Sequence, residues 1–392
     1  MNQPSLPDAL HCPAELQEIS RALSAEIRSE IQLQGAMSFA RFMELSLYHP
    51  TMGYYQSETR KFGVEGDFIT APELSPLFSQ CVANQLAQVL RGIPESSILE
   101  LGAGSGVMAV DMLRHLQQLQ SLPMHYYILE LSAQLRSRQQ ERVAREIPWF
   151  FDRVTWLDSL EEFQLNGVVL ANELLDAMPV QRFRKTDHSF VEICVKAEGE
   201  NFVWSEKEAG ADLLQAVQAL EQRLGFNFPE DYNSEIHSLI APWMRAIANV
   251  LQQGLLLLID YGYPEQEYYL PERSMGTLMC HFRHRAHDNP LVLVGVQDIT
   301  SYVNFSTVAQ SAVESAFDLA GFTSQAHFLL ACGIDRLMPD YANSKEYYES
   351  VRQLKLLTLP GEMGERFKVM ALTKGIDEPL LGFSFADFSS RL

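Results

Sequence analysis

The sequence predicts an α/β fold in which a mostly parallel sheet is covered by helices on both faces. Three observations lead to this prediction. Short, continuous apolar runs recur along the chain, amphipathic helical segments alternate with them, and a glycine-rich turn joins the first run to the helix that follows. Because a strand that is buried on both faces reads as a continuous apolar run, a doubly covered sheet accounts for all three.

The core elements follow one another from residue 97 onward. We expect strands at 97–101, 126–131, 154–157, 167–171 and 255–260, and closing strands at 328–331 and 367–373. Helices are expected at 106–119 and 132–146, each directly after a strand. The pattern therefore predicts a seven-stranded sheet.

An N-terminal extension, residues 1–90, precedes this core. Its first expected helix spans 14–34, where apolar residues recur at helical spacing, and a second short helix spans 37–48. A long loop rich in glycine and aromatic residues follows, and a loop of this length is usually functional when it is not disordered. Ser75 and Pro76 then open a helix that runs to about residue 90, with proline at the favoured first helical position.

The remaining boundaries follow from the spacing of the strands. Residues 91–179 form the first part of the core, 180–254 an insertion between strands four and five, and 255–392 the rest of the core with a small insertion at 333–365. The longer insertion contains an expected hairpin at 190–204 and two helices, and it is too long for a simple crossover. We expect it to form, with the N-terminal region, a cap over the carboxyl edge of the sheet.

Composition narrows the function classes. The chain has 392 residues, 47% of them hydrophobic, and a formal net charge of −20. No basic stripe is apparent that would neutralise phosphates, so nucleic acid is a disfavoured partner. The five cysteines are scattered without a CxxC pair, which argues against disulfide and zinc frameworks. No apolar stretch approaches the length of a bilayer span, and the N-terminus has no signal or transit pattern, so we expect a cytoplasmic protein without membrane contact.

The strongest candidate site is the segment ILELGAGSG, which ends the first core strand. Glycines in such a turn permit positive φ and let a ligand approach the backbone, and the following helix N-terminus offers free N–H groups. The pattern is G-x-G-x-G, whereas a nicotinamide site favours G-x-G-x-x-G. With an acidic residue two positions earlier, it resembles the first motif of class I methyltransferases, which have a Rossmann-like core. That resemblance implies S-adenosyl-L-methionine as cofactor, with contacts from Glu100, Gly102, Gly104 and Gly106.

Glu130 ends the second core strand and is a further cofactor candidate. An acidic side chain at this place can accept hydrogen bonds from both ribose hydroxyls. Nicotinamide enzymes use the same arrangement, so Glu130 alone does not discriminate between the two cofactors. The alternative interpretation is a solvated strand end.

Several segments together resemble the MidA-type family of class I methyltransferases. They cover the chain from about residue 36 to about residue 374 and include HPTMGYY, GDFITAPELS, LELGAGSG, ANELLDAMPV, IDYGY, RHRAHDNP, QDITSYVNF and MGERFKVM. The mitochondrial members of this family are assembly factors for respiratory complex I and act as protein arginine methyltransferases. The resemblance further implies that GDFITAPELS folds back over the cofactor, with Asp67 and Phe68 as cofactor contacts and Glu73 as a substrate contact.

The segment ANELLDAMP follows strand four, at the sheet edge where open α/β sheets bind ligands. We predict Asn172, Glu173 and Asp176 as catalytic residues, because carboxylates can accept paired N–H bonds from a guanidinium group. They could equally orient an amine or a hydroxyl nucleophile. The alternative is an ordinary helix start, in which Asn172 caps the helix and the two acids favour its dipole.

Three further residues are candidate substrate contacts. Tyr54 could face a cation through its ring, although partly buried packing is an equally reasonable role. Arg283 and His284 could contact an acidic group of a substrate or partner. A metal site is suggested at first sight by Cys280, His281, His284 and His287. Arg283 and Arg285 lie among them and oppose a dication, so no metal is expected.

These observations leave three functions open. The first is a methyltransferase that acts on an arginine of a partner protein. The second is a small-molecule O- or N-methyltransferase, and the third is a non-catalytic assembly chaperone that keeps a cofactor-shaped fold, since the fold alone does not decide among them. The sequence leaves the oligomeric state open, a homodimer included.

Overall fold

The computed structural model describes residues 12–56, 70–339 and 345–392 of the chain. Its centre is an eight-stranded sheet, in which seven strands follow the order β15-β16-β10-β5-β2-β3-β4 and β14 pairs with the end of β10. The strands are β2 (Ser97–Leu101), β3 (Tyr126–Leu129), β4 (Val154–Leu157), β5 (Leu165–Asn172), β10 (Leu251–Tyr263), β14 (Val303–Asn304), β15 (Asp318–Ser324) and β16 (Phe367–Lys374).

This sheet confirms the expected fold class. Five strands that are adjacent in the sheet run parallel to one another: β4, β3, β2, β5 and β10. Strand β16 is antiparallel to both β10 and β15, so the sheet is mixed but mostly parallel. Strand β10 shows why the apolar runs are continuous: Leu255 and Leu257 pack into the core on one face, and Leu256 and Leu258 into the core on the other.

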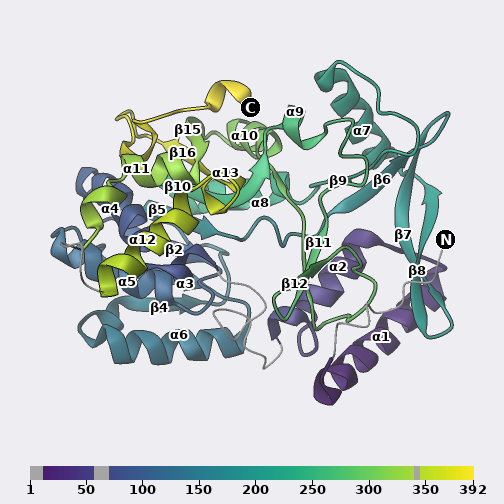
Figure 1. The fold of residues 1–392 in the computed structure, drawn as a ribbon, viewed down its shortest axis with the longest axis horizontal. Helices are drawn as coiled ribbons and strands as arrows, with labels where there is room; N and C mark the ends of the chain where they lie inside the picture. The colour runs from purple at the N-terminus through teal and green to yellow at the C-terminus, as the bar shows by residue number, and fades with distance from the viewer. Residues whose placement is uncertain (1–11, 57–69, 340–344) are drawn as a thin grey trace.

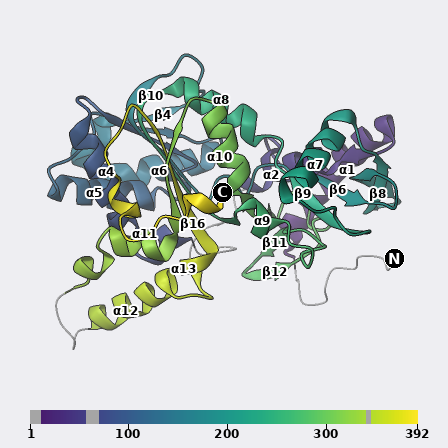
Figure 2. The same ribbon diagram turned by 90° about the horizontal axis from the view of Figure 1, so that it is seen from above.

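Helices cover both faces of the sheet, as Figure 1 and Figure 2 show. One core cluster contains side chains of α4, α5 and α11, and the opposite one contains side chains of α8 and α10. The helices of the core are α3 (Ala71–Leu74), α4 (Pro76–Gly92), α5 (Val107–Gln118), α6 (Ala133–Glu146), α8 (Ile240–Val250), α10 (Phe305–Glu314), α11 (Gln325–Ala331), α12 (Lys345–Thr358) and α13 (Met363–Arg366).

One predicted strand is wrong. Residues 328–331 belong to helix α11, and the strand at this edge of the sheet is β15. The side chain of Ser324 accepts a hydrogen bond from the His327 N–H and caps the helix. A run of four apolar residues is too short to show the periodicity of a helix or of a strand. The sequence pattern of residues 328–331 therefore fits both, and the cap at Ser324 indicates the helix.

A second group of elements lies to the right of the core in Figure 1, and it joins the N-terminal extension to the insertion after β5. Strand β1 pairs with β7 through Met37 and Val195, so the two parts of the chain share one sheet. Its elements are α1 (Ala14–Gln34), β1 (Met37–Ser38), α2 (Phe39–Tyr48), β6 (Gln181–Lys185), β7 (Phe190–Glu198), β8 (Asn201–Glu208), α7 (Ala211–Leu224) and β9 (Asn233–Ile236). We call this group the cap.

A small three-stranded sheet and a short helix complete the structure beside the cap. They are α9 (Glu265–Tyr268), β11 (Met279–Phe282), β12 (Arg285–His287) and β13 (Asp298–Thr300). In the described part of the chain, no helix is both long and apolar enough to cross a membrane.

Candidate functional site

A cavity of about 1240 Å³ lies between the carboxyl ends of the core strands and the cap. Residues of both parts line it, so the cap closes over the sheet edge at which ligands of open α/β folds bind. The structure brings eight predicted site residues together on its wall: Glu73, Glu100, Gly102, Gly104, Glu130, Asn172, Glu173 and Asp176.

The glycine loop turns sharply between β2 and α5. Gly102, Gly104 and Gly106 have φ of +69°, +52° and +78°, a region that side-chain-bearing residues rarely adopt. A Cβ atom on Gly102 would lie 3.1 Å from Leu174 Cδ1. Gly106 itself does not line the cavity but precedes Val107, where α5 begins. The loop therefore presents bare backbone and a helix N-terminus to the cavity.

Glu130 is held in place by hydrogen bonds from neighbouring residues. Its Oε1 accepts a hydrogen bond from the Ser132 N–H at 3.0 Å, and its Oε2 accepts one from Gln139 Nε2 at 3.0 Å. The same Gln139 nitrogen donates to the Gly104 carbonyl at 2.9 Å, and Trp156 Nε1 donates to Gln139 Oε1 at 3.0 Å. Gln139 thus joins the glycine loop to the acidic end of β3.

Gln139 belongs to none of the motifs, but its position in helix α6 indicates a role. Leu135, Gln139 and Val143 are buried at four-residue spacing on the inner face of α6. A polar residue in such an apolar stripe needs hydrogen-bond partners. Its partners here are two parts of the candidate cofactor site.

We expect Glu130→Ala to weaken cofactor binding. If Glu130 accepts hydrogen bonds from the ribose, its loss removes charge-assisted bonds worth roughly 1.5–3 kcal/mol. The dissociation constant for S-adenosyl-homocysteine, measured by calorimetry, should then rise by about tenfold to a hundredfold. Glu141→Ala, on the exposed side of the same helix α6, is the matched control and should bind normally. An unchanged constant for Glu130→Ala would show that another residue contacts the ribose.

Glu100 is the second acidic residue beside the glycine loop. It is buried and its Oε2 accepts a hydrogen bond from the Tyr126 hydroxyl at 2.7 Å. Burial raises the pKa of Glu100 to about 7, while the bond from Tyr126 acts in the opposite direction. This carboxyl group can therefore ionise near neutral pH when a positive charge approaches it.

The segment after β5 forms a turn whose backbone is fixed by Asp260, at the end of β10. Asp260 Oδ2 accepts hydrogen bonds from the N–H groups of Leu174, Leu175 and Asp176 at 3.2, 2.9 and 3.2 Å. Asp260 Oδ1 accepts a fourth from the Tyr261 N–H at 2.9 Å. A buried carboxyl group therefore satisfies the turn that carries the candidate catalytic acids.

The carboxyl groups of Glu173 and Asp176 both have raised pKa values. Burial raises the pKa of Glu173 to about 8, with a further rise from Asp176, while the Asn172 amide opposes it. Burial also raises the pKa of Asp176 to about 6, against the hydrogen bond from the Tyr261 hydroxyl. Asn172 Nδ2 donates to Glu173 Oε1 at 3.2 Å. Asp176 Oδ1 and Asn172 Oδ1 are buried and have no hydrogen-bond partner among the described residues.

The cap and the small sheet beside it add further residues to the cavity. Asp298 is buried, lines the cavity, and accepts a hydrogen bond from the Tyr55 hydroxyl at 3.2 Å. The rings of Tyr55 and Tyr48 stack with centroids 5.4 Å apart, and the Tyr48 hydroxyl donates to the Ala177 carbonyl at 3.0 Å. The cavity thus has aromatic and acidic groups on its cap side as well as on its core side.

Other predicted residues lie elsewhere. Tyr54 is fully buried in the apolar cluster beneath α1 and α2 and does not line the cavity, which fits the alternative role of packing. Arg283 and His284 form the exposed two-residue turn between β11 and β12, where both have positive φ as a type I′ turn requires. They also do not line the cavity. Glu73 does, and it accepts a hydrogen bond from the Ser105 hydroxyl. Asp67 and Phe68 lie outside the described residues.

Comparison with known proteins places this geometry in context. Residues 81–323 match the family described as "Putative S-adenosyl-L-methionine-dependent methyltransferase". A crystal structure of a Burkholderia thailandensis protein bound to S-adenosyl-homocysteine is 38% identical, with a TM-score of 0.93, and the match covers 99% of this chain and all of that one.

Curated relatives are similar over most of their length. The mitochondrial protein arginine methyltransferase NDUFAF7 homolog of Drosophila melanogaster is 28% identical, over 93% of this chain and 89% of the relative. The mitochondrial protein arginine methyltransferase NDUFAF7 of Homo sapiens is 27% identical, over 88% of this chain and 81% of the relative.

Proposed function

Since this chain belongs to the family of S-adenosyl-L-methionine-dependent methyltransferases, we propose that it methylates the guanidinium group of an arginine in a partner protein. The observation that carries this proposal is a pair of buried oxygens, Asp176 Oδ1 and Asn172 Oδ1, beside the carboxyl group of Glu173, for which residues 12–56, 70–339 and 345–392 provide no hydrogen-bond partner. Buried acceptors need donors, and a guanidinium group offers five N–H donors in a fixed plane. The printed names of the curated relatives support the same activity.

The cofactor of this family is S-adenosyl-L-methionine, and the described residues fit it. The glycine loop offers bare backbone, and Glu130 offers a carboxylate already oriented by Gln139. When bound, the cofactor supplies an electrophilic methyl group. No metal is required by this chemistry.

The residues of the chain supply alignment and a destination for a proton. Glu173 and Asp176 orient the guanidinium group and draw its positive charge away from the attacking nitrogen. When that nitrogen takes the methyl group, the carbon–sulfur bond of the sulfonium would break and a neutral thioether would leave. The nitrogen loses one N–H proton, which Glu173 accepts. The raised pKa of Glu173, about 8, suits it to hold this proton.

The charge of the site also fits a cationic substrate. Two arginines, Arg41 and Arg366, line the cavity, against seven acidic residues: Glu44, Glu73, Glu100, Glu130, Glu173, Asp176 and Asp298. The whole chain carries a formal charge of −20, which favours encounter with basic partners. A basic protein segment is therefore the proposed partner. The cytoplasmic location of the protein remains a prediction.

The test is label transfer from methyl-labelled S-adenosyl-L-methionine into an extract of cells that lack the protein. We expect labelled protein bands that yield methylarginine on hydrolysis, and none with Glu173→Gln protein. Label on lysine or in small molecules would contradict the arginine proposal and favour a small-molecule or another protein methyltransferase. No label at all, despite binding of the cofactor, would favour a non-catalytic assembly role.

A further inference from the structure

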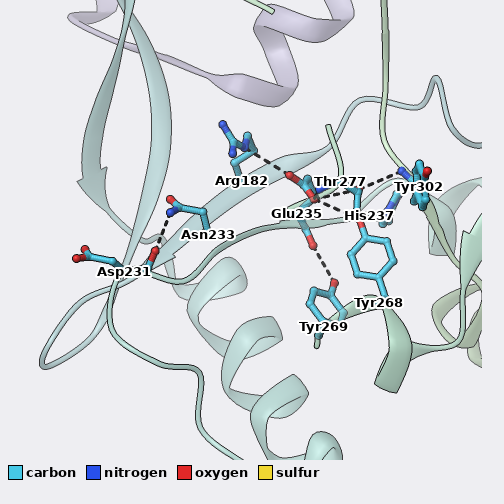
Figure 3. Close-up of polar contacts among 9 residues, drawn as sticks. All are labelled: Arg182, Asp231, Asn233, Glu235, His237, Tyr268, Tyr269, Thr277 and Tyr302. Carbon is cyan, nitrogen blue, oxygen red and sulfur yellow. Dashed lines mark hydrogen bonds and ion pairs between the residues drawn. The ribbon is translucent and has the colours of Figure 1, made fainter. Parts of the chain in front are cut away.

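A second cluster of buried polar side chains lies in the cap, and Figure 3 shows it around Glu235. Glu235, on β9, is fully buried, and its Oε2 accepts hydrogen bonds from the Thr277 N–H at 2.9 Å, the Thr277 hydroxyl at 3.2 Å and the Tyr268 hydroxyl at 3.3 Å. Arg182 Nε lies 3.6 Å from Glu235 Oε1 and balances its charge. Burial raises the pKa of Glu235, while Arg182 and the hydrogen bonds from Thr277 and Tyr268 act in the opposite direction and favour the carboxylate.

The chain around this carboxylate is shaped to reach it. Gly276 has a φ of +78°, and a Cβ atom there would lie only 2.1 Å from Glu235 Oε1. Only glycine therefore lets the loop close onto the carboxylate. On the other side, the Arg182 guanidinium lies over the Trp204 ring, 4.8 Å from its centroid, and is fixed by that contact.

Thr277 connects this cluster to the active site. The Thr277 hydroxyl directs its hydrogen toward Glu235, which leaves a lone pair for the Tyr302 N–H at 3.1 Å. The preceding N–H, that of Ser301, donates to the Asp176 carbonyl at 2.9 Å. Two successive backbone N–H groups are thus hydrogen-bonded: that of Tyr302 to Thr277, and that of Ser301 to the candidate catalytic residue Asp176.

The side chain of Tyr302 makes a second connection to the same residue. Its ring packs edge-on against Tyr261, with centroids 5.2 Å apart and planes at 73°. The Tyr261 hydroxyl donates to the Asp176 carboxyl group. Residues 301 and 302, which we call the linking segment, therefore contact the Asp176 backbone directly, and they reach its carboxyl group indirectly through Tyr261.

We propose that Glu235 is a positioning residue for methyl transfer: through Thr277 it holds the linking segment, and through that segment it holds Asp176 and Tyr261. The proposal rests on the proposed function for its catalytic consequence, but its structural part can be measured separately. Because hydrogen bonds from Tyr261 favour the ionised form of Asp176, loosening the linking segment should also raise the pH at which Asp176 ionises.

Thr277→Val is the sharpest variant. Valine keeps the shape of threonine and removes the hydroxyl, whereas Glu235→Ala would leave the buried charge of Arg182 without its partner and threaten folding. We expect the Ser301 amide in Thr277→Val to exchange its hydrogen at least about tenfold faster, because the segment opens locally more often. Transfer to an arginine-containing substrate should fall about tenfold in kcat, with a pH profile displaced upward, and Thr277→Ser should restore both.

Tyr269→Phe is the matched control. It removes a buried hydroxyl that donates to the Glu235 carbonyl at 2.8 Å, without touching Thr277 or the linking segment. We expect it to lower Tm about as much as Thr277→Val while leaving Ser301 exchange and the pH profile unchanged. Unchanged Ser301 exchange in Thr277→Val, or an equal change in Tyr269→Phe, would overturn the proposal. A third outcome is faster exchange of the Ser301 amide in Thr277→Val alone, together with no arginine methylation by the native protein. This outcome would support the positioning role and contradict the proposed function.

Discussion

Replacing Glu173 by glutamine should lower the rate of methyl transfer by at least about 10²-fold, the usual scale for a positioned acid–base or electrostatic group. The substitution keeps the shape of the side chain and removes its charge and its capacity to accept a proton. Binding of S-adenosyl-homocysteine should stay within about twofold of the native value, because Glu173 lies on the turn after β5 and not on the glycine loop.

The backbone at Glu173 supports a functional role. Its φ is +50°, which is uncommon for a residue other than glycine. The surrounding structure holds this conformation: the Glu173 N–H donates to the Ile259 carbonyl at 2.8 Å, and Asp260 fixes the next three N–H groups. Such positions cluster at active sites, where the surroundings impose the geometry.

The pH dependence gives this variant a distinctive signature. The pKa of Glu173 is raised to about 8 and that of Asp176 to about 6, so both carboxyl groups hold their protons to higher pH than in water. A guanidinium group stays charged throughout, so it is bound better as each carboxyl group ionises. The kcat/KM of the native protein should therefore rise with pH through about 6 and again toward about 8, and Glu173→Gln should lose only the upper rise.

Glu192→Gln is the control for this comparison. Glu192 is also a buried glutamate, but it lies on β7 in an ion pair with Lys207 and does not line the cavity. Its replacement should leave kcat/KM and the pH profile unchanged. Normal methylation by Glu173→Gln protein would remove Glu173 from the mechanism.

The sequence predicted the core because each strand carries its own local signal. A strand buried on both faces, such as β10, is apolar at every position, and a turn with three glycines marks the step from β2 to α5. The acidic ends of β2, β3 and β5 could be predicted as one site because the carboxyl ends of parallel strands meet at one edge. The structure places Glu100, Glu130 and Glu173 together on one cavity wall, as that reasoning requires.

The contacts that the sequence did not reveal are those made by long-range packing. Asp298 reaches the cavity because β13 pairs with β11, and Asp260 serves a turn that lies more than 80 positions earlier in the chain. The sequence predicted that the N-terminal extension and the insertion form one cap, but it did not reveal the pairing of β1 with β7 that joins them. No local pattern encodes such a pairing, because its stability comes from tertiary contacts.

The largest effect on cofactor binding is expected from Gly104→Val. Gly104 lines the cavity with a φ of +52°, and its carbonyl accepts a hydrogen bond from Gln139 at 2.9 Å. A β-branched residue fits this conformation poorly, and its methyl groups would stand where a ligand approaches the bare backbone. We expect the affinity for S-adenosyl-L-methionine, measured by calorimetry, to fall by at least about a hundredfold, equivalent to about 2.7 kcal/mol.

The effect of backbone strain in Gly104→Val must be separated from steric exclusion of the cofactor. Another glycine with positive φ provides the control. Gly199, in the turn between β7 and β8, has a φ of +61°, and a Cβ atom there would meet nothing within 4 Å. Gly199→Val therefore introduces similar strain far from the cavity, and we expect a comparable fall in Tm with unchanged cofactor affinity. If Gly104→Val still bound the cofactor normally while circular dichroism showed a native fold, the glycine loop would not be the surface against which the cofactor lies. If both variants lost binding equally, the loss would reflect general destabilisation, because Gly104 lines the cavity and Gly199 does not.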